Sequence, residues 1–179
     1  MEIYNGMPTE VKYDRAEVQD LIERYFDVLG EATRMENKEE GIAAINEFLT
    51  EDYLNRESDW PRNRSKAQFA SWWIGCAPRY YREFHMRKPD GYAVIDCRTG
   101  IVCVCARQEV YRKKTGEIVR AGLNSIHMEV KYENGKLKIA RECWTTIPAL
   151  FATDHLDIGD HKDGKPCWLY KDYSKEFEV

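Results

Sequence analysis

Three long alternating segments in the second half of the chain most constrain how it can fold. Polar and apolar residues alternate over 101–113, 117–132 and 136–146, and Thr115-Gly116 and Asn134-Gly135 separate these segments. Alternation with a period of two predicts β-strands, and such glycine-containing separators are typical of hairpins. Strands of 11 to 16 residues exceed the usual length of about five or six, and long antiparallel neighbours twist and curl strongly. We therefore expect a bent antiparallel sheet.

Two shorter strands are expected near 82–86 and 92–97, before the long ones. Pro89-Asp90-Gly91 separates the two, and Thr99-Gly100 separates the second from the long segments. Both separators contain the glycine that tight connections require.

Three helical patterns come before the strands. The first begins with the pair Asp14 and Glu17, the second covers about Lys38–Thr50, and the third begins with Ser65 and its capping partner Gln68. The segment Asn55–Arg64 between the second and third helices is expected to be a polar connection. Helices followed by strands predict an α+β fold with the helices on one face of the sheet. The apolar stripe of the first helix is Val18, Leu21, Ile22, Tyr25, Phe26 and Leu29.

Length and charge indicate one ordinary globular domain. The 179 residues include 27 Lys and Arg against 31 Asp and Glu, a net charge of −4, which argues against a nucleic-acid partner. No apolar run approaches the roughly 18 residues that a membrane span needs, and residues 1–10 lack the pattern of a secretion signal. The six cysteines show neither a C-x-x-C motif nor zinc spacing. We expect a cytoplasmic protein with reduced thiols, no metal and no membrane partner.

Aromatic residues make up 12% of the chain, and their positions suggest a pocket. Tyr25 lies on the first helix, Trp73 on the third, and Trp144 near the end of the last strand, so we expect these rings to meet inside the fold. Residues 147–179 show no clear period. We expect a domain over 1–146 and a C-terminal tail over 147–179 that covers the pocket or a neighbouring subunit.

The alternation leaves open which face of the strand over 101–113 lines the interior. Arg107 and Glu109 share one face with a tyrosine and two cysteines, and an apolar set with Val104 takes the other. The pair is therefore either a charged floor of the pocket or a solvated surface pair. On the next strand His127 is expected to face outward, and Asn124 to be a buried amide or a ligand contact.

The last strand poses the same question for its acidic residue. Leu137, Ile139 and Cys143 alternate with Ala140, Glu142 and Trp144. Glu142 is either a pocket residue beside Trp144 or a surface carboxylate.

The helical start, followed by a hairpin-rich sheet ending in GKLKIARECW (135–144), resembles the nuclear transport factor 2-like superfamily and within it the SnoaL-like proteins. The resemblance covers about Asp14 to Thr146. It implies a cone-shaped, curved antiparallel sheet wrapped around three N-terminal helices, a cystatin-like α+β barrel with an apolar pocket at its open end. Members include isomerases, dehydratases, cyclases, epoxide hydrolases and proteins without catalysis, so the fold implies a pocket rather than a reaction.

Two positions resemble the scytalone and bile-acid dehydratases of this superfamily. Tyr25 matches a pocket-facing tyrosine on the first helix, and His85 matches a histidine on the first strand. This implies a cofactor-independent dehydratase or isomerase acting on an apolar, ring-containing small molecule. His85 would move the proton, Tyr25 would hold a carbonyl, and Glu109 or Asn124 would orient the reacting groups. The competing explanations are a core tyrosine and a structural histidine.

Other positions resemble limonene-epoxide hydrolase. Tyr53-Leu54-Asn55, Arg107-Gln108-Glu109 and Arg141-Glu142 match its motifs, with Glu where the hydrolases have Asp. This implies that Tyr53 and Asn55 hold a water, that Glu109 or Glu142 acts as base and acid, and that Arg107 lies between them.

A third expectation is a non-catalytic small-molecule binding module. In every case a small molecule is the expected partner, and a homodimer or homotrimer formed through the outer sheet face is the expected assembly.

Overall fold

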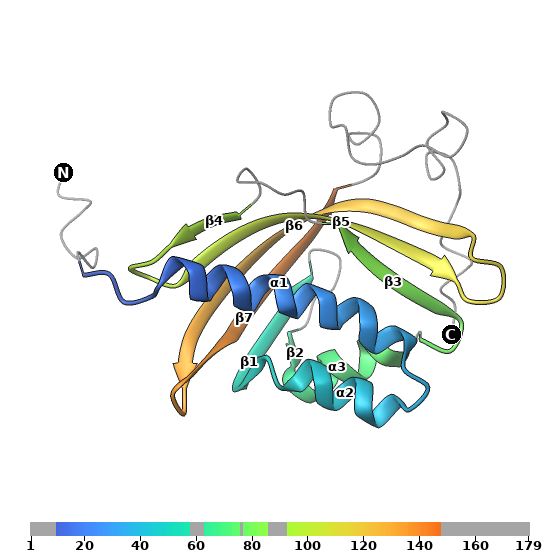
Figure 1. Ribbon diagram of the computed structural model, residues 1–179, viewed down its shortest axis with the longest axis horizontal. Helices are drawn as coiled ribbons and strands as arrows, with labels where there is room; N and C mark the ends of the chain where they lie inside the picture. Colours follow the sequence, from blue (N-terminus) through green and yellow to red (C-terminus); the bar gives the residue numbers. More distant parts are fainter. Residues whose placement is uncertain (1–9, 58–62, 76, 86–92, 148–179) are drawn as a thin grey trace.

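Three helices pack against the concave side of one curved sheet, and the long strands arch over the first helix (Figure 1). The structure is a computed structural model that describes residues 10–57, 63–75, 77–85 and 93–147. The helices are α1 (Arg15–Glu31), followed by a short 3₁₀ turn at Ala32–Arg34, α2 (Lys38–Asn46) and α3 (Lys66–Gly75).

The predicted helix starts are confirmed. Asp14 Oδ1 accepts a hydrogen bond from the Glu17 backbone N at 2.9 Å at the start of α1. At the start of α3, Ser65 and Gln68 form the reciprocal capping box, with Ser65 N donating to Gln68 Oε1 at 3.0 Å and Gln68 N to Ser65 Oγ at 3.4 Å. All six residues of the apolar stripe of α1 are buried, so this helix contributes one continuous face to the core.

The sheet has the order β2-β1-β7-β6-β5-β3, and β4 pairs with β5 on the same side as β3. Apart from the parallel pairing of β1 with β7, the strands of this curved sheet pair antiparallel. Helices on one face of the sheet give the α+β fold that the resemblance implies. The strands are β1 (Leu49–Glu57), β2 (Arg64–Ser65), β3 (Tyr80–His85), β4 (Ala93–Asp96), β5 (Ile101–Arg112), β6 (Ile118–Glu133) and β7 (Lys136–Ile147).

Strand β1 was not predicted, and it makes the sheet mixed rather than wholly antiparallel. We expected the second helix to continue to about Thr50 and a polar connection to follow, but α2 ends at Asn46 and β1 pairs in parallel with β7. Leu49 and Tyr53 extend the apolar spacing of α2, so the local pattern resembles more helix. The pairing with β7 is a long-range interaction that local periodicity does not contain.

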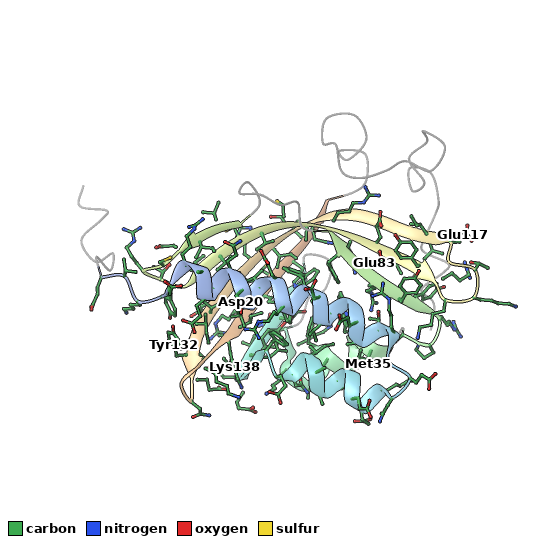
Figure 2. All side chains as sticks on the ribbon, viewed as in Figure 1. Asp20, Met35, Glu83, Glu117, Tyr132 and Lys138 are labelled. Atoms are coloured by element: carbon green, nitrogen blue, oxygen red, sulfur yellow. The ribbon has the colours of Figure 1, made fainter. Side chains whose placement is uncertain are left out.

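The structure decides which sheet faces line the core. Val102, Val104 and Ala106 of β5 are buried in the main hydrophobic cluster, so the apolar face of this strand points inward. His127 of β6 is exposed, as predicted. The α1 side is tied to the far end of β6 by Tyr132, labelled in Figure 2, whose hydroxyl donates to Glu17 Oε2 at 2.6 Å.

A β-bulge interrupts β7 at Ala140. Glu129 pairs with Arg141 and Val130 pairs with Ile139, so Ala140 is an extra residue in the ladder. A bulge reverses the alternation beyond it. Ile139 and Glu142 are therefore both buried, although an uninterrupted strand would place them on opposite faces.

Gly100 fits closely against this bulge. Its carbonyl accepts a hydrogen bond from Val130 N at 2.8 Å. Its φ is +76°, and a Cβ added to it would lie 2.6 Å from the Val130 carbonyl oxygen and 2.9 Å from the Tyr13 ring. Only glycine meets both requirements without movement of the backbone.

No helix in the described part of the chain is long and apolar enough to cross a bilayer. The expected tail over 147–179 lies outside the described residues, apart from Ile147 at the end of β7.

Gly100→Ala is predicted to destabilise the fold more than Gly116→Ala. Both glycines have positive φ, but an added Cβ at Gly116 meets nothing within 4 Å. We expect about 1 kcal/mol for Gly116→Ala from backbone strain alone and about 2 to 4 kcal/mol for Gly100→Ala, because strain and overpacking add. Urea unfolding of the two variants measures the difference, and equal losses would contradict the proposed close fit.

Candidate active site

The candidate site is centred on the carboxyl group of Glu142, which the bulge in β7 turns into the core. Glu142 is only 3% exposed. A buried carboxylate is costly unless hydrogen bonds stabilise it. Its partners therefore determine whether it can carry charge.

One oxygen of this carboxyl group is held by three donors from three elements. Glu142 Oε2 accepts from the Tyr53 hydroxyl of β1 at 2.6 Å, from Trp144 Nε1 of β7 at 3.0 Å and from the Tyr25 hydroxyl of α1 at 3.1 Å. Contacts from a helix and two strands fix both the position and the rotation of the carboxyl group. Such fixation is what an acid/base group requires.

The environment of Glu142 brings the pKa of its carboxyl group close to neutral pH. Burial raises its pKa from an ordinary value of 4.5 to about 7, while the hydrogen bonds from Tyr53, Trp144 and Tyr25 act in the opposite direction. Burial, together with the charge of Glu142, raises the pKa of Tyr25 and of Tyr53 well above the usual value of 10. The two tyrosines therefore stay protonated and act as donors.

Asn55 is the polar neighbour of the Glu142 carboxyl group on the adjacent strand β1. Asn55 and Glu142 are directly paired residues of the parallel strands β1 and β7, and Asn55 is fully buried. Asn55 Oδ1 accepts from Arg64 Nη1 at 3.2 Å. Among the described residues, neither Asn55 Nδ2 nor Glu142 Oε1 has a hydrogen-bond partner of good geometry, but a side-chain hydrogen bond from Asn55 contributes to lowering the pKa of Glu142, so the amide NH₂ group faces the carboxyl group.

These two atoms define what the site can accept. Nδ2 is a donor and Oε1 an acceptor, so a hydroxyl group or water between them would accept one hydrogen bond and donate the other. Buried polar atoms are almost always paired in native proteins. A hydroxyl-bearing ligand or a water is therefore the kind of group that would complete the pairing of both atoms.

Aromatic rings enclose this carboxyl group. Trp144 lies against Phe26, Trp73 and Phe84, with ring centroids 5.8 to 6.2 Å apart. Tyr53 packs against Phe69 at 5.6 Å. The predicted meeting of the aromatic residues inside the cone is confirmed.

Six of the expected site residues come together here. Trp73 contributes its ring only, because its Nε1 already donates to the Leu29 carbonyl at 2.8 Å. The other five are Tyr25, Tyr53, Asn55, Glu142 and Trp144. Tyr25, Tyr53 and Trp144 donate hydrogen bonds to Glu142, and Asn55 is paired with Glu142 across β1 and β7.

Asn124 is buried on the same inner face but is engaged elsewhere. It is 1% exposed, and its Nδ2 donates to Gln108 Oε1 of β5 at 3.4 Å. In the ladder it pairs with Thr146, two residues beyond Trp144. The expected buried amide is confirmed, and its role as a ligand contact stays a prediction.

Arg107 and Glu109 do not join the site, which corrects the expectation of one cavity holding both with Glu142. They alternate with Val104 and Ala106 of β5, whose side chains fill the core, so the charged pair lies on the opposite face of the sheet. There the two side chains form an ion pair with each other, and Tyr111 donates to Glu109 Oε2 at 2.5 Å. Burial of the apolar face of β5 therefore turns Arg107 and Glu109 away from the core.

His85 ends β3, where its backbone pairs with Arg107. Its side chain lies outside the described part of the structure, so its proximity to Tyr25 stays a prediction.

Arg64 is a residue of this site that the sequence did not reveal. It lies in the segment expected to be a polar connection, and a single arginine ahead of a helix cap carries no recognisable signal. No group of three His, Cys, Asp or Glu residues in the described ranges could hold a metal ion.

Glu142→Gln is predicted to change how stability depends on pH. Because the folded pKa is raised to about 7, the folded state binds more protons than the unfolded state between about pH 4.5 and 7. The contribution of Glu142 to stability therefore falls as pH rises through this window. Relative to the unmodified protein, Glu142→Gln should gain about 2 to 3 kcal/mol in unfolding free energy between pH 5 and pH 8.

Urea unfolding at the two pH values measures this gain. Glu129→Gln is the matched control, because Glu129 is a glutamate of the neighbouring strand that pairs with Arg141 at the surface. Parallel pH profiles for Glu142→Gln and the unmodified protein would contradict a raised pKa.

No protein-family model and no curated protein matches the sequence of this chain. Solved structures match its fold. An NTF2-like protein from Pseudomonas putida is 14% identical with a TM-score of 0.53, covering 90% of this chain and 100% of the other. A ketosteroid isomerase-like protein from Erwinia carotovora atroseptica is 16% identical with a TM-score of 0.52, covering 74% of this chain and 95% of the other.

A third match is an LEH-like epoxide hydrolase from M. tuberculosis, 11% identical with a TM-score of 0.51, covering 74% of this chain and 84% of the other. At such identities the matches establish the fold alone. The structural neighbours include an NTF2-like protein and a protein with a cystatin-like fold, and the chain has this α+β fold.

Proposed function

We propose that the chain is a cofactor-independent lyase or isomerase that acts on an apolar, ring-containing small molecule, with Glu142 as the group that transfers the proton. One observation carries the proposal. Glu142 is a buried carboxyl group with one oxygen fixed by three donors and the other unpartnered beside an amide donor. The ketosteroid isomerase-like and epoxide hydrolase neighbours support chemistry on a small molecule.

The pKa of Glu142 suits both directions of proton transfer. A group with a pKa of about 7 is present in both protonation states at neutral pH, so it can accept a proton and return it in one turnover. Fixing Oε2 leaves Oε1 as the reacting atom. The aromatic rings packed around Glu142 would favour a substrate with an apolar ring.

Tyr25 takes a different role from the one the dehydratase resemblance implies. Its hydroxyl donates to Glu142 Oε2, so we propose that it and Tyr53 hold the carboxyl group rather than a substrate carbonyl. Asn55 Nδ2 is then the donor that faces the substrate.

Dehydration of a β-hydroxy carbonyl compound illustrates the balanced step. Glu142 Oε1 removes the proton next to the carbonyl, and the released electron pair forms the carbon–carbon double bond as the carbon–oxygen bond breaks. The hydroxyl group, held by Asn55 Nδ2, receives the same proton from Glu142 and leaves as water. One carboxyl group serves both transfers if the proton and the hydroxyl leave from the same face.

Hydrolysis is the second candidate, because the same donor and acceptor can hold a water that Glu142 activates. Opening an epoxide also needs an acid at the epoxide oxygen. The hydrolase resemblance implies Glu109 or Glu142 as base and acid, but Glu109 lies on the other face of β5, so a second carboxyl group does not reach Glu142 from there. Proton return by one carboxyl group is therefore the better supported reaction.

Glu142→Gln is predicted to abolish proton exchange on a substrate. Incubation of a panel of cyclic ketones and β-hydroxy ketones in D₂O, followed by NMR, detects deuterium incorporated next to the carbonyl and any dehydration. We expect the unmodified protein to incorporate deuterium into at least one compound and Glu142→Gln to lose at least about 100-fold in rate, the usual scale of general-base catalysis.

Glu129→Gln, which alters an exposed carboxylate, should leave the rate unchanged. His85→Asn separates the two proton carriers. Exchange lost in His85→Asn and retained in Glu142→Gln would overturn the proposal in favour of the histidine.

A further inference from the structure

We infer that Arg64 is a positioning residue that fixes the orientation of the Asn55 side-chain amide, so that the NH₂ group of Asn55 faces the carboxyl group of Glu142. The inference rests on the proposed function, in which that NH₂ group meets the reacting hydroxyl.

Arg64 is itself held rigidly. It lies in the two-residue strand β2, directly paired with Asn55 of β1, and is only 7% exposed. Its guanidinium carbon lies 4.0 Å from the centroid of the Trp72 ring, a cation–π contact that favours one position of the charge. A short strand and a stacked indole therefore hold the guanidinium group against Asn55.

The chemistry of the two groups allows one orientation of the amide. Amide oxygen and nitrogen occupy nearly the same shape, so a buried asparagine can turn by 180° at little steric cost. Arginine donates hydrogen bonds and accepts none. The contact of Arg64 Nη1 with Asn55 Oδ1 at 3.2 Å is favourable, whereas the turned amide would place its NH₂ group against the guanidinium.

This orientation sets which ligand the site selects. With Oδ1 held by Arg64, Asn55 presents its NH₂ donor to the Glu142 carboxyl group. A hydroxyl group satisfies a donor and an ionised acceptor together, whereas a carbonyl oxygen satisfies only the donor. Arg64 thus selects a hydroxyl group or water without touching it.

The orientation of the Asn55 amide also affects the pKa of Glu142. The ionisable groups that face this carboxyl are Tyr25 from α1 and Tyr53 from β1, and the Trp144 NH of β7 and the Asn55 amide of β1 are its polar neighbours. An amide donor favours the ionised carboxylate, and an amide oxygen favours the protonated form. Removing Arg64 frees the amide to turn, which should raise the pKa of Glu142.

Arg64→Met tests this by ¹³C NMR titration of the Glu142 carboxyl carbon, assigned with Glu142→Gln. We expect the pKa of Glu142 to rise by about 0.5 to 1 unit. Arg64→Lys, which keeps a donor, should return it towards the value in the unmodified protein. If Arg64→Met does not fold, Arg64→Gln replaces it in the test. Because a glutamine can either donate to or accept from the Asn55 amide, the pKa of Glu142 should rise by less than in Arg64→Met.

Arg82→Met is the matched control for loss of a buried arginine. Arg82 is 6% exposed, lies 4.3 Å over the Trp73 ring and donates to the Trp73 carbonyl at 2.8 Å. It should destabilise the fold comparably and leave the titration of Glu142 unchanged. A purely structural role for Arg64 predicts equal behaviour of the two variants.

Asn55→Ala completes the test. If Arg64 acts through the amide, most of the shift caused by Arg64→Met disappears in the Asn55→Ala background. A shift of the same size in both backgrounds, or none in either, overturns the inference. An ordinary pKa for Glu142 in the unmodified protein would instead overturn the proposed function.

Discussion

The burial of one ionisable carboxyl group is the constraint on which the arrangement of this protein depends. Placing Glu142 in the core is unfavourable for the charged form, and the surrounding structure offsets this with three donors to one oxygen. These donors come from α1, β1 and β7, so the helix, the parallel strand and the central strand must all be in place together. The site and the packing of the cone are therefore one structure.

The position of that carboxyl group depends on a local irregularity in the sheet. The extra residue at Ala140 brings Ile139 and Glu142 to the same face. Gly100 supports this irregularity from the neighbouring turn, where its carbonyl binds Val130 N at 2.8 Å. Bulges beside active sites commonly redirect a side chain, and here the redirected side chain is the proposed proton carrier.

Local patterns predicted the elements whose stability is local. The stripe of α1, the capping box of α3 and the glycines Gly100, Gly116 and Gly135 follow from short-range rules, and the structure contains these features. The separator at 89–91 lies outside the described residues. The outward position of His127 follows from simple alternation, whereas the inward position of Trp144 depends on the bulge at Ala140.

Features that depend on long-range contacts could not be predicted from local sequence patterns. Strand β1 forms because β7 accepts it in parallel, and its sequence continues the spacing of a helix. Alternation described both faces of β5 correctly but did not show that Val104 rather than Arg107 would face the core. Arg64 gains its contact with Asn55 only once β2 pairs with β1.

The central claim is that Glu142 is poised between its two protonation states at neutral pH. Titration of its carboxyl carbon by ¹³C NMR in the unmodified protein tests this claim most directly. The structure predicts a midpoint near pH 7, the pKa to which burial raises Glu142. A midpoint between about 4 and 5, the ordinary range of glutamate, would contradict it.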